Sequence, residues 1–202
     1  MADDPQVEDD KPVSKVAIID ENYCTQKSQE FIVLKKMTKF QTNAVFQVFD
    51  VDQNLLLQAD GLKWLLHRTF LMKDSHDSPI VTLHEARITD KRRWDVYEGD
   101  STDAPDHMFK VQRTSAFQVN ARLDILFLDN PNPEEGRFQI KKDDASSNTA
   151  AMYQGSRIIA RVEHRNTWKN FFQGKDELKV EVTEGIDYAF VMSVLIIMGN
   201  AI

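Results

Sequence analysis

The chain has 202 residues, of which 42% are hydrophobic and 28% charged, a composition typical of a soluble globular protein. Its formal net charge of −7 excludes a general basic field, so nucleic acid is not expected as a direct ligand. The single cysteine, Cys24, excludes an internal disulfide framework and fits a reducing compartment. The N-terminus shows no basic and apolar leader, and we therefore expect a cytoplasmic protein, with a membrane-peripheral or a nuclear location as alternatives.

Residues 1–30 form an acidic tail and a lead-in to the rest of the chain. The first fifteen or so carry prolines and carboxylates but few large apolar side chains, a pattern that predicts disorder. From Phe31 the pattern changes, and we expect a single domain over residues 31–202.

Short runs of apolar and β-branched residues, separated by turn formers, fill the middle of the chain. Each run is the length of a strand, and the spacing between runs is typical of sandwiches and barrels. About eleven or twelve strands are therefore predicted. The runs are Phe31–Met37, Val45–Asp50, Leu55–Asp60, Trp64–Met72, Pro79–Ile88, Arg93–Gly99, Met108–Thr114, Phe117–Asp129, Phe138–Lys142, Ala150–Gly155, Ile158–His164 and Leu178–Val182.

The last segment, IDYAFVMSVLIIMGNAI, carries no charged side chain after Asp187. From Tyr188 to the end it would measure about 22 Å as a helix, short of a hydrocarbon core of about 30 Å. Acidic residues precede it and no Lys or Arg follows, which argues against a membrane anchor. We predict a helix at about residues 186–200.

Large apolar residues point in every direction around this helix, so it must be enclosed on all sides. The many-stranded sheet is the only partner in the chain that is large enough to enclose it. The predicted fold is therefore mainly β, a closed antiparallel barrel of about 12 strands around a central hydrophobic C-terminal helix. Burying each large apolar side chain contributes roughly 1.5–3 kcal/mol, so the barrel is not expected to close without the helix.

Four segments resemble the plant LURP-one-related family, within the tubby C-terminal-like superfamily that also includes phospholipid scramblases. They are FQVFDVDQNLLLQADG (Phe46–Gly61), PIVTLHEARITDKRRWDVYEGDST (Pro79–Thr102), FKVQRTSAFQVNARLDILF (Phe109–Phe127) and GKDELKVEVTEGIDYAFVMSVLIIM (Gly174–Met198). The most specific are the RW-x-V-x-x-G-D-S-T run at Arg93–Thr102 and the GKD…DYAF run at Gly174–Phe190.

The resemblance implies the same barrel around a central C-terminal helix and no enzymatic activity. It also implies kinship with membrane-tethered transcription regulators and, for some members, a role in plant defence. The chain departs from the family at KKDDASSNTA (Lys141–Ala150), where relatives often carry a Gly-Ser-Trp segment, and after Met198, where relatives usually continue into charged residues. These departures weaken the transfer of a particular functional surface.

No catalytic, cofactor or metal site is predicted from the remaining motifs. Asp50–Asn54 matches the first positions of a calcium-binding loop. However, Leu55 occupies the position of the loop's glycine and Gly61 that of its bidentate glutamate, so a hairpin turn is expected. The five histidines show no metal-ligand spacing. His84 and Glu85 are neighbours on a strand and should face opposite sides of the sheet.

Basic residues are the only chemical lead to function. Tubby domains bind phosphoinositide headgroups through basic side chains, so the resemblance suggests anionic phospholipid as a partner. A protein is the alternative partner. The candidate contacts are Lys35, Lys36 and Lys39 on the first strand and Lys91, Arg92 and Arg93 at a strand junction. The same charges are also explained if these residues lie on solvent-exposed strand faces, where charged side chains prevent pairing between sheet edges.

The alternative function is a carrier of a small apolar ligand inside the barrel.

Overall fold

The computed structural model of the chain describes residues 15–37, 44–64, 67–88, 91–113, 122–127, 137–142, 148–164 and 177–201. The predicted acidic tail before Lys15 lies outside these residues. The strands are β1 (Gln29–Met37), β2 (Ala44–Phe49), β3 (Leu55–Trp64), β4 (His67–Asp74), β5 (Pro79–Ile88), β6 (Lys91–Glu98), β7 (His107–Arg113), β8 (Arg122–Phe127), β9 (Phe138–Lys142), β10 (Thr149–Gln154), β11 (Arg157–His164) and β12 (Glu177–Val182).

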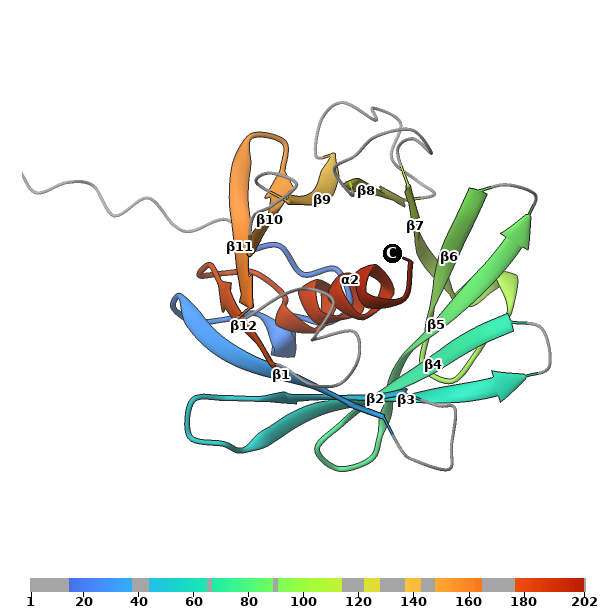
Figure 1. The fold of residues 1–202 in the computed structure, drawn as a ribbon, viewed down its shortest axis with the longest axis horizontal. Coiled ribbons are helices and arrows are strands. Elements are labelled where there is room, and N and C mark those ends of the chain that lie inside the picture. The colour runs from blue at the N-terminus through green and yellow to red at the C-terminus, as the bar shows by residue number, and fades with distance from the viewer. Residues whose placement is uncertain are drawn as a thin grey trace, which may run out of the picture.

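The twelve strands form one closed barrel in which each strand pairs antiparallel with its neighbours in the chain (Figure 1). The barrel closes where β1 meets β12, with Gln29 opposite Val182 and Leu34 opposite Glu177. Closure leaves no unpaired edge among the described strands, and edges are where sheet proteins aggregate. The predicted fold class, an antiparallel barrel of about 12 strands around a helix, is confirmed.

Alternation along each strand separates an apolar inner face from a polar outer face. In β1 the side chains of Phe31 and Val33 are buried inside, at 0% and 1% exposure, while the intervening residues face outward. The turn at Asp50–Asn54 is a hairpin turn as expected, because the Asp50 carboxylate accepts hydrogen bonds from the backbone N–H and the side-chain amide of Asn54, at 2.8 and 2.9 Å.

The helix α2 (Tyr188–Ala201) runs through the interior of the barrel (Figure 1). From Ala189 to Met198 every side chain is at most 2% exposed, so the helix is enclosed on all sides, as its sequence predicted. Phe190 packs edge-on against Phe109 of β7 and Phe138 of β9, with ring centroids 5.3 Å apart in both pairs. The one polar side chain in this stretch, Ser193, donates to the Phe190 carbonyl at 2.7 Å and so is satisfied within the helix.

No helix in the described part of the chain has the length and apolar character needed to cross a membrane.

The start of α2 is fixed by the buried carboxylate of Asp187. Its Oδ1 accepts a hydrogen bond from the Phe190 N–H at 2.9 Å, as an N-terminal helix cap. Its Oδ2 accepts from the backbone N–H groups of Ile18, Ile19 and Asp20 at 3.2, 2.6 and 3.2 Å. Burial raises the pKa of this carboxyl, and the four N–H groups oppose that rise. One side chain therefore ties the lead-in to the helix.

The lead-in, residues 15–28, adds further backbone contacts to the same end of the barrel. The Val16 N–H donates to the Gly185 carbonyl and the Gly185 N–H to the Thr25 carbonyl, both at 2.8 Å. A short 3-10 helix, Glu21–Tyr23, lies between them, and Tyr23 packs edge-on against Tyr188 with ring centroids 5.5 Å apart. The lead-in thus covers the end of the barrel at which the helix begins.

Ile196→Asp should abolish the cooperative unfolding transition, because Ile196 is 1% exposed and an unpaired carboxylate in its place is strongly disfavoured. Thermal unfolding followed by circular dichroism measures this. The matched control, Ile196→Val, should keep a sharp transition and cost only about 1 kcal/mol. An unchanged transition in the aspartate variant would contradict burial of the helix.

Asp187→Ala should lower the free energy of unfolding by about 3 kcal/mol, because four backbone N–H groups lose their acceptor. It should also make residues 15–28 susceptible to limited proteolysis. Asp20→Ala is the control: its exposed carboxylate caps only the short 3-10 helix, and its loss should cost about 1 kcal/mol or less. Equal stability losses in the two variants would refute the role of Asp187.

Candidate functional site at the mouth of the barrel

The end of the barrel at which α2 finishes is called the mouth here. Strands β1, β3, β5, β7, β9 and β11 end at the mouth, because consecutive strands alternate in direction and β12 runs away from it into the helix start. At the mouth the Arg68 guanidinium Nη1 donates to the backbone carbonyl of Asn200 at 2.9 Å. A cation thus meets the carbonyl end of the helix, where the helix dipole is negative.

Basic side chains occupy the inner-face positions nearest the mouth. Each continues the alternation of a strand whose deeper inner positions are buried apolar residues: Lys35 follows Phe31 and Val33, and Arg68 leads into Phe70 and Met72. The same rule places the others. These basic mouth residues are Lys35 in β1, Arg68 in β4, Arg113 in β7, Lys142 in β9 and His164 in β11.

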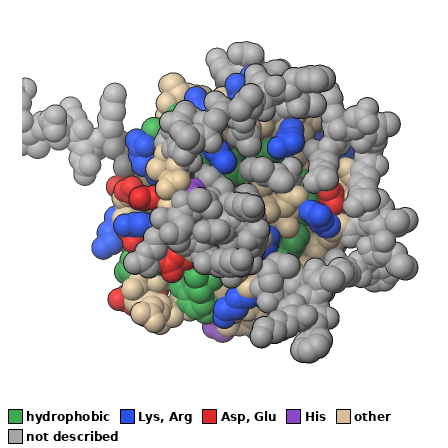
Figure 2. Space-filling model, in the orientation of Figure 1, with side chains coloured by type: hydrophobic (Ala, Val, Ile, Leu, Met, Phe, Trp, Pro, Cys, Tyr) green, Lys and Arg blue, Asp and Glu red, His purple; other side chains and the backbone are tan. Residues whose placement is uncertain are grey.

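Figure 2 shows Lys and Arg side chains spread around the middle of the face on which the C-terminus lies in Figure 1.

Lys35 is the most buried lysine described, at 8% exposure. Its Nζ lies over the Phe46 ring, 5.3 Å from the ring centroid. Burial, with a smaller contribution from the positive charge of Arg68, lowers the pKa of this ammonium from 10.5 to about 8. Burial also lowers the pKa of Lys142. Perturbed pKa values of this kind cluster at functional sites.

Among the described inner-face residues at the mouth, Glu85 is the one that carries a carboxylate. It is 2% exposed, and its Oε2 lies 4.0 Å from the Arg68 Nε. Trp94 lies directly opposite it across the β5–β6 pair. Within the described residues neither the Glu85 Oε2 nor the Trp94 indole N–H has a hydrogen-bond partner. His84, next to Glu85, lies on the other face, where its Nδ1 is 3.0 Å from the Thr69 hydroxyl.

The structure separates the predicted basic clusters. Lys35 is buried on the inner face, whereas Lys36 is exposed on the outer face, so the two do not form one patch. Lys39 lies outside the described residues. Sequence reasoning did not find Arg68, Arg113 or Lys142, although the signal was present: each stands one alternation step beyond the apolar inner residues of its strand.

The second cluster, Lys91, Arg92 and Arg93, opens β6 at the mouth. Of these side chains only that of Arg93 is described, and it lies on the outer face. Its Nη2 donates to the Asp95 Oδ2 at 2.9 Å, while the Asp95 Oδ1 lies 3.1 Å from the His107 Nε2. Arg93 is therefore the partner of a nearly buried carboxylate, and removing it is expected to cost stability as well as charge.

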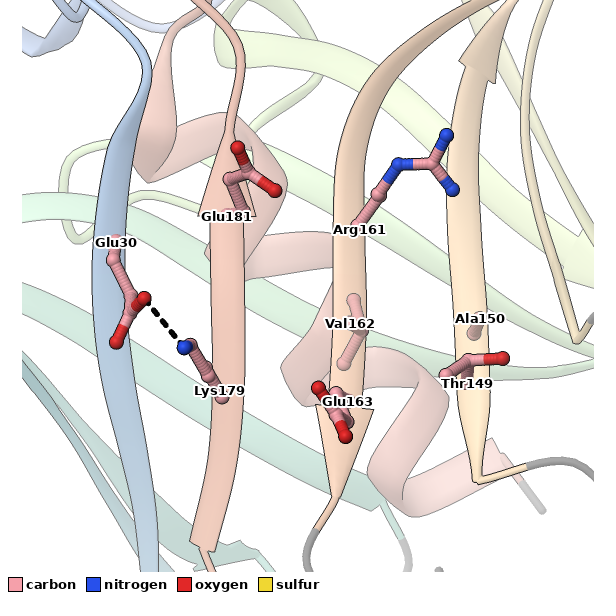
Figure 3. A pocket seen from close by; sticks show the side chains of 8 residues that line it. All are labelled: Glu30, Thr149, Ala150, Arg161, Val162, Glu163, Lys179 and Glu181. Carbon is pink, nitrogen blue, oxygen red and sulfur yellow. Dashed lines mark ion pairs between the residues drawn. The ribbon is translucent and has the colours of Figure 1, made fainter.

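A second feature is a shallow hollow of about 340 Å³ on the outer face of β1, β12, β11 and β10 (Figure 3). Lys179 pairs with Glu30 at 2.7 Å, and Arg161, Glu163 and Glu181 extend from the neighbouring strands. The hydrogen bond that Lys179 donates to Glu30 raises the pKa of Lys179. Both partners of the pair are well exposed, at 52% and 38%, so we interpret this as a solvated ladder of charges that contributes little to stability.

Within the described residues, no group of three or more His, Cys, Asp or Glu side chains is arranged to hold a metal ion.

A β-barrel whose interior is filled by its own C-terminal helix defines a distinct structural class. The X-ray structure of a protein from Arabidopsis thaliana shares this fold, with a TM-score of 0.68, 26% identity, and coverage of 91% of this chain and 97% of that one. The family model described as LURP-one-related matches residues 29–199. The chain therefore belongs to the LURP-one-related family.

Individual relatives extend over most of the chain. Protein LURP-one-related 15 of Arabidopsis thaliana is 29% identical over 191 residues, covering 94% of this chain and 87% of the relative. Protein LURP1 of the same plant is 27% identical over 186 residues, covering 90% and 87%. The resemblance seen in the sequence is thus confirmed at the level of the family.

Lys35→Met should raise the free energy of unfolding by about 2 kcal/mol at pH 7, because it removes a buried ammonium. Above a pH of about 8 the folded wild type loses this proton, whereas the unfolded chain keeps it up to about 10.5, so the wild type gains stability over that window. The advantage of the variant should therefore shrink from pH 8 to pH 10.

Chemical denaturation at several pH values measures this difference, and Lys36→Met on the outer face is the control, with no change expected at any pH. A Lys35→Met protein less stable than the wild type at pH 7 would show that the ammonium is a net stabilising group.

Proposed function

We propose that the protein is a non-enzymatic binding domain that holds an anionic phospholipid headgroup at the basic mouth of its barrel. The observation that supports this is the placement of the basic mouth residues on the inner face at one end of the barrel, on a chain whose net charge is −7. Among the described inner-face residues at this end, Glu85 is the one carboxylate, and it lies 4.0 Å from Arg68. Ammonium and guanidinium groups suit phosphate oxygens, and Arg presents a fork that matches them.

The end of α2 does not explain all of this positive charge. The carbonyl end of a helix carries about half a negative charge, which one cation is enough to complement. Arg68 already donates to the carbonyl of Asn200. Lys35 adds a second, nearly buried cation at the same end of the barrel, and its lowered pKa is of the kind that clusters at functional sites.

Binding of this kind places the protein at the surface of a membrane, on the cytoplasmic side, where anionic lipids are enriched. A role in plant defence is the corresponding expectation from the family. The alternative function, carriage of a small apolar ligand inside the barrel, has little support because α2 occupies the interior from Ala189 to Met198.

The proposal predicts that the purified protein sediments with vesicles containing phosphoinositides and not with neutral phosphatidylcholine vesicles. Because the attraction is electrostatic, affinity should fall steeply between low and physiological salt. Replacing Arg68 and Arg113 together with Gln should weaken binding about tenfold or more, since each basic residue near an anionic surface contributes about 1 kcal/mol.

The matched control is Arg161→Gln with Lys179→Gln, which removes the same charge from the outer face and should leave binding unchanged. Neutralising Lys91, Arg92 and Arg93 together tests the rim of the mouth and should also weaken binding. Failure of both vesicle types to bind at low salt would refute the lipid proposal in favour of a protein partner.

A further inference from the structure

We propose that the outer wall of the barrel around β1 and β12 is a docking surface for an amphipathic helix of a partner protein, one whose apolar side is flanked by Lys and Arg. This surface is called the seam face here, because β1 and β12 close the barrel. It consists of the outward-facing side chains of β2, β1, β12 and β11 and does not include the mouth. The inference therefore does not rest on the proposed binding of phospholipid.

Three apolar side chains lie together on the seam face. Ile32 and Leu34 are successive outward positions of β1, and Phe49 of β2 lies directly opposite Ile32. All three are partly exposed, whereas the inward residues beside them are buried. Figure 2 shows apolar side chains at the surface beside Asp and Glu side chains at the lower left, where β1 and β12 lie in Figure 1. Apolar side chains that are grouped on a surface and bordered by charges are a feature of protein interaction sites.

Carboxylates border this apolar patch on the side of β12. Across the β1–β12 pair, Glu177 lies opposite Leu34 and Glu181 lies opposite Glu30. Like charges that lie directly opposite one another, as those of Glu30 and Glu181 do, are unfavourable in a sheet. Lys179 offsets part of this repulsion, since its Nζ lies 2.7 Å from the Glu30 Oε2. A cation supplied by a partner would offset more of it.

The surface is hollowed over the same residues. Two adjoining hollows, of about 340 and 440 Å³, share Glu30, Glu163 and Lys179, and the second also reaches Ile32 of the apolar patch; Figure 3 shows the first. Four carboxylates and two cations line them: Glu30, Glu163, Glu177, Glu181, Arg161 and Lys179. The excess of carboxylates beside apolar side chains fits a partner that carries basic and apolar side chains together.

The arrangement of the strands favours a helix as the partner. β1 and β12 are each paired on both sides, so neither offers an edge to which a further strand could be added. A partner must therefore lie on the face of these strands. Neighbouring strands are about 4.8 Å apart, so β11 lies about 10 Å from β1, close to the diameter of a helix with its side chains. A helix along β1 would cover Ile32 and Leu34 and reach Glu163 with basic side chains from one flank.

The test measures the binding of three labelled peptides to the full chain by fluorescence anisotropy at low salt. The first is an amphipathic helix of Leu and Lys of about 18 residues, or five turns. The second has Glu in place of Lys, and the third has Ser in place of Leu at the same charge. The Leu–Lys peptide should bind about tenfold or more tightly than either of the others, because it alone supplies both the cations and the apolar side.

Two pairs of substitutions locate the binding on the seam face. Glu163→Lys with Glu177→Lys should weaken binding of the Leu–Lys peptide about tenfold or more at low salt, because attraction becomes repulsion. Ile32→Thr with Leu34→Thr should weaken it at low and high salt alike, because salt screens charges but not apolar contact. The matched control is Glu98→Lys with Asp103→Lys. These two residues are exposed at the end of β6 and in the turn beyond it, half the barrel away from β12, and should have little effect.

Equal binding of the Leu–Lys and Ser–Lys peptides would overturn the proposal, as would the absence of binding, and neither comparison depends on the folding of a variant. Equal losses in the Glu163 and Glu177 variant and in the control would also overturn it, because binding would then be a general attraction between a basic peptide and an acidic chain. Binding of vesicles at the mouth is a separate measurement, so failure here leaves the phospholipid proposal standing.

Discussion

Enclosure of an apolar helix by a closed sheet is the constraint on which the rest of this structure depends. Helix α2 presents large apolar side chains in every direction, so only a surface that surrounds it can bury them all. A barrel surrounds it and at the same time removes its own sheet edges. The sheet supplies the walls and the helix supplies the core, so neither is expected to be stable alone.

The two ends of the barrel differ because the helix has two different ends. At its start the free N–H groups meet an anion, the carboxylate of Asp187, which also binds the lead-in and covers that end. At its finish the free carbonyls meet a cation, Arg68. The covered end joins the lead-in to the start of the helix, whereas the mouth gathers basic side chains from the inner faces of several strands.

Much of the fold could be predicted from the sequence, because alternation marks the strands and the all-round apolar pattern of Tyr188–Ile202 marks an enclosed helix. The site could not be predicted so well. Lys35 and Lys36 are neighbours in the sequence but face opposite sides of β1, and Arg68 joins Lys35 only when the barrel brings β4 and β1 around the same opening. The grouping of these side chains depends on the order of the strands and on closure of the barrel, and neither can be read from the local pattern of apolar and polar residues.

The pairing of β1 with β12 has a consequence for the biogenesis of the protein. Gln29 pairs with Val182, so β1 remains without one of its two neighbours until all the intervening strands and β12 have been synthesised. Contacts this distant in sequence slow folding, and a nascent sheet with an open edge and an empty interior is prone to aggregation. The nascent chain should therefore depend strongly on chaperones during translation, and this dependence should end when the helix enters the barrel.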